Sequence, residues 1–159
     1  AETGAARIAA LEAGAYRPVN VVVLDAARAF FLRGLGHGRP ECRLLGTGVS
    51  MVTAHDPNDR SSPRVRRHLP RFRTSPPPDP ETEAGWQDWE TLLFDEEQPE
   101  PAAALRVPPV GGFGTVSSSL VGLAANGRRV WRFAAGPAPF GSVQTAADHE
   151  PARKGAFIR

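Results

Sequence analysis

The short connections between strand-like segments in the first third of the chain limit the fold more than any other feature. Val-rich residues 18–24 are followed, after three residues, by a second segment at 28–33. Two more segments, 41–45 and 48–53, come soon after. A parallel pair needs a crossover of about a dozen residues or more, and no gap here is that long. The sequence therefore predicts four antiparallel strands in this region.

Helix signals flank these strands. Residues 5–13 combine helix formers with Gly14 as a C-cap. Ser61 or Ser62 can cap a helix that begins at Pro63, a favoured first position for proline. We expect this helix to end near Leu69, because Pro70 removes a backbone donor and clashes with the preceding turn.

The second half of the chain predicts one more helix and a hairpin. Trp86, Trp89 and Leu93 share one helical face and should be buried together. Residues 115–134 alternate on both sides of Asn126-Gly127, the favoured pair for a tight two-residue turn.

Length and composition fit one α+β domain with antiparallel sheets and flanking helices. The chain has 159 residues, of which 41% are hydrophobic and 23% charged, as in globular proteins. We expect this domain to cover residues 1–143 and to be followed by a loose tail at 144–159. No apolar run approaches the roughly 20 residues of a membrane span. Because the chain opens without Met inside a predicted helix, we also expect it to be part of a longer protein.

Charge is unevenly distributed along the chain. Residues 1–73 carry a net charge of +6, residues 74–100 carry −9, and residues 101–159 carry +5. Two interpretations are open: the acidic middle lies against its basic neighbours, or the basic parts form a partner-binding face. The single cysteine, Cys42, excludes an internal disulfide and a cysteine-based zinc site, and is compatible with a reducing cytoplasm.

Three polar clusters could carry chemistry. Residues 53–59 place one His, two Asp and one Asn at a strand end, which suits metal binding, acid–base work or a capped turn. Residues 60–73 hold six arginines and His68, which suits an anionic ligand or an internally paired face. We expect no nucleic-acid partner, because no DNA- or RNA-binding signature accompanies these arginines. Ser117-Ser118-Ser119 lacks the motif of a nucleophile elbow.

Several segments, taken in order, resemble the NRDE family, the homologues of transport and Golgi organisation protein 2. The segments at residues 69–73, 78–80 and 86–93 are similar to the bacterial branch of this family. The resemblance covers roughly residues 5–143 and is carried by residues 16–25, 48–56, 69–73, 78–80, 86–93 and 112–120.

The resemblance implies an αββα sandwich like that of the N-terminal-nucleophile hydrolases. Family members begin with Met-Cys and carry an Asn-Arg-Asp-Glu motif, and both features are missing from this chain. It therefore looks like the C-terminal part of such a protein. The implied function is non-catalytic binding or trafficking of haem or a similar amphipathic anion, in the cytoplasm. Two alternatives are a remnant of an amide hydrolase and a basic protein-interaction module.

A haem site needs an apolar slot, cations for the propionates and an axial ligand. His37, His55 and His68 all have arginine neighbours in the sequence. If part of the sandwich is missing, an edge strand or apolar patch should be open and should favour self-association.

The candidate ligand-binding residues are Asn20, Thr53, His55, Ser117 and Arg71. Asn20 interrupts an apolar strand, so its side chain must find a polar partner. We expect Asn20, Thr53 and His55 to meet in one pocket with Ser117 close by, and Arg71 to supply a cation. In the alternative interpretation, Asn20 only bonds a neighbouring loop and His55 faces solvent.

Overall fold

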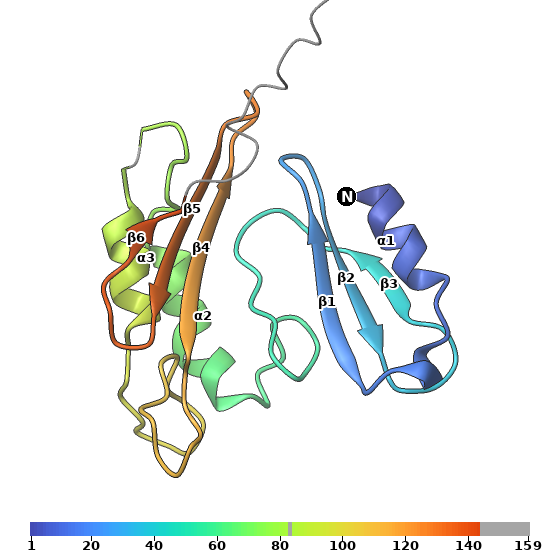
Figure 1. Cartoon of the computed structure of the whole chain (residues 1–159), viewed down its shortest axis with the longest axis horizontal. Coiled ribbons are helices and arrows are strands. Elements are labelled where there is room, and N and C mark those ends of the chain that lie inside the picture. The colour runs from blue at the N-terminus through green and yellow to red at the C-terminus, as the bar shows by residue number, and fades with distance from the viewer. Residues whose placement is uncertain (83, 144–159) are drawn as a thin grey trace, which may run out of the picture.

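The computed structural model describes residues 1–82 and 84–143, so the tail predicted at 144–159 lies outside the described residues. It confirms a mixed α+β chain and has two separate antiparallel sheets of three strands (Figure 1). The first sheet has the order β1-β2-β3, and the second has the order β4-β5-β6. Their bounds are β1 (Val19–Leu24), β2 (Ala29–Gly34), β3 (Glu41–Leu44), β4 (Ser117–Leu123), β5 (Arg129–Ala135) and β6 (Gly141–Ser142).

One face of the first sheet packs under α1 (Glu2–Ala9), which is followed by a short 3-10 turn, η1 (Ala13–Ala15). The predicted helix at 5–13 is therefore displaced, and Gly14 lies inside the 3-10 turn instead of capping the helix. The antiparallel register pairs Val22 with Phe31, and Phe31 and Leu32 are fully buried. Asn20 and Val22 lie on the face of β1 opposite to Val21 and Val23, because side chains alternate along a strand.

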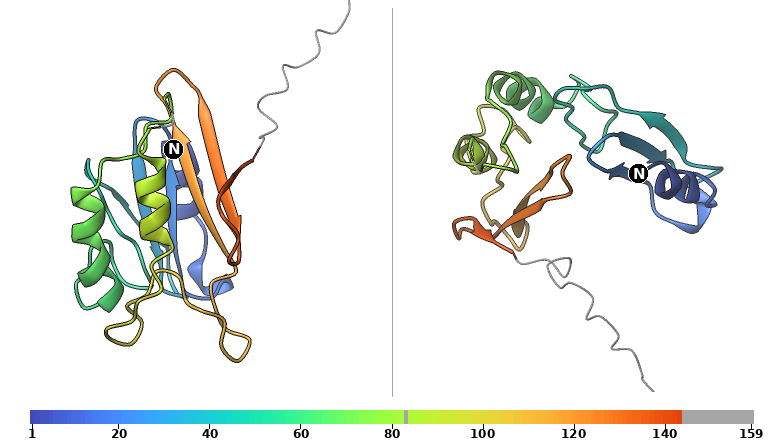
Figure 2. Two further views of the ribbon diagram at one scale, coloured as in Figure 1. Left: turned by 90° about the vertical axis from the view of Figure 1, so that its left-hand side faces the viewer. Right: turned by 90° about the horizontal axis from the view of Figure 1, so that it is seen from above.

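Two helices, α2 (Pro63–Thr74) and α3 (Trp86–Leu93), cover one face of the second sheet (Figure 2). Trp86 is buried against β4, where a Cβ on Gly122 would lie 3.0 Å from its indole. Trp89 and Leu93 are only half-buried, so the prediction of a fully buried helical face is correct for Trp86 alone.

Pro70 does not end α2, and this prediction was wrong. The helix continues to Thr74, although an internal proline costs about 3 kcal/mol. Phe72, one half-turn beyond Pro70, is buried and meets Trp89 edge-to-face at 4.9 Å between ring centroids. The Thr74 hydroxyl also donates to the Pro70 carbonyl at 3.2 Å. This packing and bonding in the last turn offsets the cost of Pro70. The Ser62 cap is confirmed, since its hydroxyl accepts from Val65 N.

The predicted strand at 48–53 is a loop, so the first sheet has three strands and not four. Gly48 adopts φ +95°, a conformation outside the strand region. The main chain of Met51 bonds Asn58 twice, through Asn58 N and through the Asn58 side-chain oxygen. The backbone groups that a strand would pair with a neighbour are thus used inside the loop.

The hairpin of β4 and β5 is confirmed, but its turn has three residues and not two. Ala124 N donates to Arg128 O, and Gly127 N donates to Ala124 O, with Gly127 at φ +90°. A glycine in the left-handed region is typical of three-residue hairpin loops. Asn126 accepts from Arg128 N through its side chain and so stabilises the turn.

The face of β4 and β5 that points away from α2 and α3 is open. Val121 is 61% exposed and Trp131 38% exposed on this face, and Val116, just before β4, is 83% exposed. In the part of the chain that the structure describes, no strand pairs with the outer edge of β4. An open edge strand and exposed apolar side chains favour self-association. Self-association of this chain stays a prediction.

Candidate functional site

The structure brings together three of the predicted site residues. The Asn20 amide donates to Thr53 O at 2.8 Å and to His55 O at 3.1 Å. The Thr53 hydroxyl accepts from His55 N at 3.2 Å. A pocket of about 430 Å³ lies beside them, and Asn20, Arg33, Leu35 and Thr53 contribute to its walls. Asn20 on β1 thus fixes the loop that follows β3.

Most polar groups of this pocket are bonded within the chain, although Arg33 Nε is buried without a hydrogen-bond partner. Both Asn20 donors are used, and Arg33 pairs with Asp56 at 3.1 Å and with Glu41 at 3.0 Å. The His55 side chain is 53% exposed, and its Nδ1 lies 4.0 Å from Asp59. This arrangement agrees with the alternative interpretation, in which Asn20 holds a loop and His55 faces solvent.

Removing the two hydrogen bonds from the Asn20 amide to Thr53 O and His55 O should loosen the loop that follows β3. We expect Asn20→Ala to lower the free energy of unfolding by about 1–2 kcal/mol, because it leaves the Thr53 and His55 carbonyls without their donor. Urea denaturation measures the effect. Asn126→Ala, which removes one exposed bond in the hairpin turn, is the matched control and should cost less. Equal losses in the two variants would contradict a special role for Asn20.

Ser117 and Arg71 lie away from this pocket. Ser117 is the exposed first residue of β4 and pairs with Ala135. Within residues 1–82 and 84–143, no hydrogen bond joins Ser117 to Asn20, Thr53 or His55. Arg71, on α2, bonds Asp95 and lies 3.2 Å from His68 Nδ1. The expectation that Ser117 completes one pocket with Asn20 finds no support in these contacts.

The basic helix α2 is paired with the acidic segment that follows α3. Arg66 contacts Glu100 at 2.7 Å, Arg67 contacts Glu97 at 2.5 Å and Asp95 at 3.2 Å, and Arg71 also contacts Asp95. Of the two interpretations of the charge pattern, the structure supports the internal one for this helix. Burial raises the pKa of Asp95, but hydrogen bonds from Arg71, the Glu97 backbone and Arg67 outweigh this effect and hold it below its ordinary value.

His68 is fully buried at the centre of the same region. Its Nε2 lies 2.8 Å from Ala103 O, and burial lowers the pKa of its ring below the ordinary value. The neutral ring therefore fixes the segment after α3 to α2. A side chain with no exposed surface and a backbone partner is not placed to bind a ligand.

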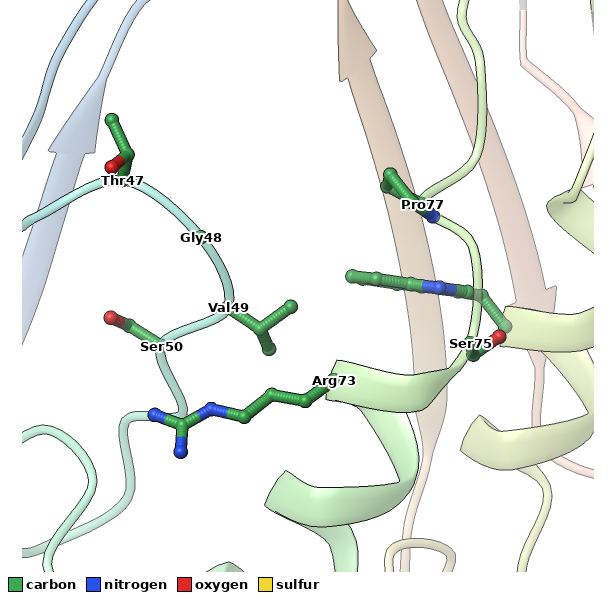
Figure 3. A pocket seen from close by; sticks show the side chains of 8 residues that line it. Thr47, Gly48, Val49, Ser50, Arg73, Ser75 and Pro77 are labelled. Atoms are coloured by element: carbon green, nitrogen blue, oxygen red, sulfur yellow. The ribbon is translucent and has the colours of Figure 1, made fainter.

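Another pocket lies in a cleft between the loop before Met51, the C-terminal end of α2 and Trp89 of α3 (Figure 3). Its volume is about 770 Å³, within the range of about 300–1,000 Å³ typical of small-molecule sites. Arg73 runs from the last turn of α2 toward Ser50, and Val49 points toward the middle of the cleft (Figure 3). The walls include Thr47, Val49, Ser50, Arg73, Ser75 and Trp89.

This cleft combines one cation with an apolar wall. Arg73 makes no ion pair with any described residue, unlike Arg66, Arg67 and Arg71 on the same helix. No carboxylate is among the cleft residues. Trp89 is held by its edge-to-face contact with Phe72, and its indole nitrogen is buried without a hydrogen-bond partner.

Sequence reasoning missed this cleft. Arg73 was grouped with the other arginines of residues 60–73, Trp89 was assigned to the core, and residues 48–53 were assigned to a strand. The spacing on α2 offers no signal for Arg73, because Arg66, which is paired with Glu100, lies seven residues or about two turns away and so on the same side of the helix. The sequence alone did not show which of these arginines meet the acidic segment.

Within the described parts of the chain, no group of three or more His, Cys, Asp or Glu side chains could hold a metal ion. Over the same residues, no helix has the length and apolar character needed to cross a membrane. No family model, curated protein or solved structure gives a significant match to this chain.

Proposed function

We propose that this chain is a non-catalytic member of the NRDE family that binds a small amphipathic anion in the cleft at Arg73. The observation that carries the proposal is Arg73, which makes no ion pair with any described residue and lies beside Val49 and Trp89 in a cleft whose described lining has no acidic residue. An arginine with no internal partner can form charge-assisted bonds to a carboxylate, while the apolar wall takes the rest of the ligand. The single exposed Cys42 is compatible with the cytoplasm as the place of this function.

Haem fits the cleft only in part. Arg73 suits a propionate, and Trp89 and Val49 suit the ring. However, the cleft walls contain no His, Cys, Met or Tyr that could ligate the iron. We therefore propose that haem, if it is the ligand, is carried as cargo through one carboxylate and its ring.

The arrangement of helices supports the assignment to an αββα sandwich. Helix α1 packs on one face of the first sheet, and α2 and α3 lie on one face of the second (Figure 2). The remaining face of the second sheet carries the exposed side chains Val121 and Trp131, which a sandwich would cover.

The two alternative functions, a remnant of an amide hydrolase and a basic protein-interaction module, have less support. Among the described residues, no hydrogen bond joins Ser117 to a basic side chain, and the arginines of α2 that a basic interaction module would expose are largely paired.

A haem titration followed by the Soret band tests this proposal. We expect saturable binding by the wild-type chain and an about tenfold weaker affinity for Arg73→Gln, since a bond to a charged group contributes about 1.5 kcal/mol or more. Arg129→Gln, an exposed arginine on β5, is the matched control and should bind like the wild type. Unchanged binding by Arg73→Gln together with loss in His55→Ala would place the site at the Asn20 pocket and contradict the proposal.

A further inference from the structure

The residues that line the cleft indicate a narrower class of ligand than amphipathic anions in general. Among the described residues that line it, Arg73 is the one cation, so the cleft can balance one carboxylate and not a strongly charged group such as a triphosphate. Thr47, Ser50 and Ser75 add hydroxyls to the walls, which donate and accept hydrogen bonds without adding charge.

The apolar part of the cleft has a rigid aromatic surface. Trp89 meets Phe72 edge-to-face, with 69° between the ring planes, and Phe72 is itself buried in α2. The contact with Phe72 therefore already restricts the Trp89 indole, so ligand binding does not have to immobilise this side chain. An aromatic ligand gains attraction from such a ring beyond the burial of its surface, and an aliphatic chain does not. Fixing a flexible chain also costs entropy that a planar ligand avoids.

From these observations we infer that the cleft binds a planar aromatic monocarboxylate, with its ring on the Trp89 wall and its carboxylate on Arg73. This inference rests on the proposed function, because it assumes that the cleft is the binding site. The carboxylate accepts from the guanidinium of Arg73, which runs toward Ser50 along one side of the cleft (Figure 3). The backbone of residues 47–50, with Val49 pointing inward, lies across the cleft from Pro77 (Figure 3).

The test compares three probes by isothermal titration calorimetry: 2-naphthoate, 2-naphthalenemethanol and octanoate. These probes separate the contribution of the aromatic ring from that of the charge, because 2-naphthalenemethanol lacks the carboxylate and octanoate lacks the ring. We expect 2-naphthoate to bind about tenfold more tightly than either of the others. Arg73→Gln should remove the advantage over the alcohol, and Trp89→Leu should remove the advantage over octanoate. Arg129→Gln should change neither.

The outcomes separate the inference from the function on which it rests. If octanoate binds as tightly as 2-naphthoate and both depend on Arg73, the aromatic class is wrong and the anion site stands. If none of the three probes binds, or binding does not depend on Arg73, both proposals are overturned. Because Trp89→Leu also removes a contact to Phe72, Trp89→Phe is measured as well. It keeps an aromatic wall and should retain most of the preference for the ring, and a complete loss in a folded Trp89→Phe chain contradicts the inferred role of that wall.

Discussion

Replacing Trp86 by alanine should lower the free energy of unfolding by about 3–5 kcal/mol, the usual cost of removing a buried tryptophan. Its side chain is only 2% exposed, and its indole nitrogen donates to Asp79 O at 2.9 Å. The ring fills the space above Gly122, where no Cβ stands in its way, so truncation leaves a cavity between α3 and β4. Urea denaturation followed by circular dichroism measures the loss.

Trp131→Ala is the matched control for this prediction. Trp131 has the same side chain but lies on the open face of the second sheet, where 38% of it is exposed. Trp131→Ala should lower the free energy of unfolding by well under half as much as Trp86→Ala, because Trp131 buries less surface and its removal leaves a smaller cavity. A loss at Trp131 as large as that at Trp86 would mean that the open face is covered in solution, for example by a second copy of the chain.

Asp95→Asn should destabilise the chain by roughly 3 kcal/mol, the lower end of the range for a broken buried ion pair. The Asp95 side chain is 7% exposed and bonds both Arg67 and Arg71, which are themselves partly exposed. Glu97→Gln also removes a partner of Arg67, but Glu97 is exposed, so this control should cost no more than about 1 kcal/mol.

The same carboxylate gives the stability a defined dependence on pH. Because the pKa of Asp95 lies below its ordinary value in the folded chain, the unfolded chain binds the proton more tightly. The stabilisation is therefore fully present well above the ordinary pKa of 3.8 and is lost as the pH falls through the lower, folded value. Wild type and Asp95→Asn should differ most near neutral pH and converge in acid. A constant difference between pH 7 and pH 3 would contradict this linkage.

Much of the local structure follows from the sequence, because it depends on short-range geometry. The short gaps around Asp25 require antiparallel strands, and the glycine after Asn126 marks the hairpin. The predictions that were wrong concern structure that depends on contacts between distant segments. The extension of α2 beyond Pro70 depends on Phe72 meeting Trp89, and the loop at 48–53 depends on bonds from Asn20 and Asn58.

The candidate site was harder to predict for the same reason. Asn20 was singled out correctly as a polar side chain that needs a partner, and the Thr53 and His55 carbonyls provide it. The sequence could not distinguish a structural clamp from a ligand pocket, because both satisfy the same amide. Nor could it separate Arg73 from its neighbours, since only the position of the acidic segment around Asp95 shows which arginines are already paired.

Chemical-shift mapping with 2-naphthoate tests the central claim most directly, because it locates binding on the chain. In the ¹⁵N-labelled protein, which has three tryptophans, the indole signal of Trp89 is assigned by its loss in Trp89→Phe. We predict saturable shifts at that indole and at the amides of residues 47–50 and Arg73, with the Trp131 indole unchanged. Shifts confined to Asn20, Thr53 and His55, or the absence of saturable shifts, would contradict the account.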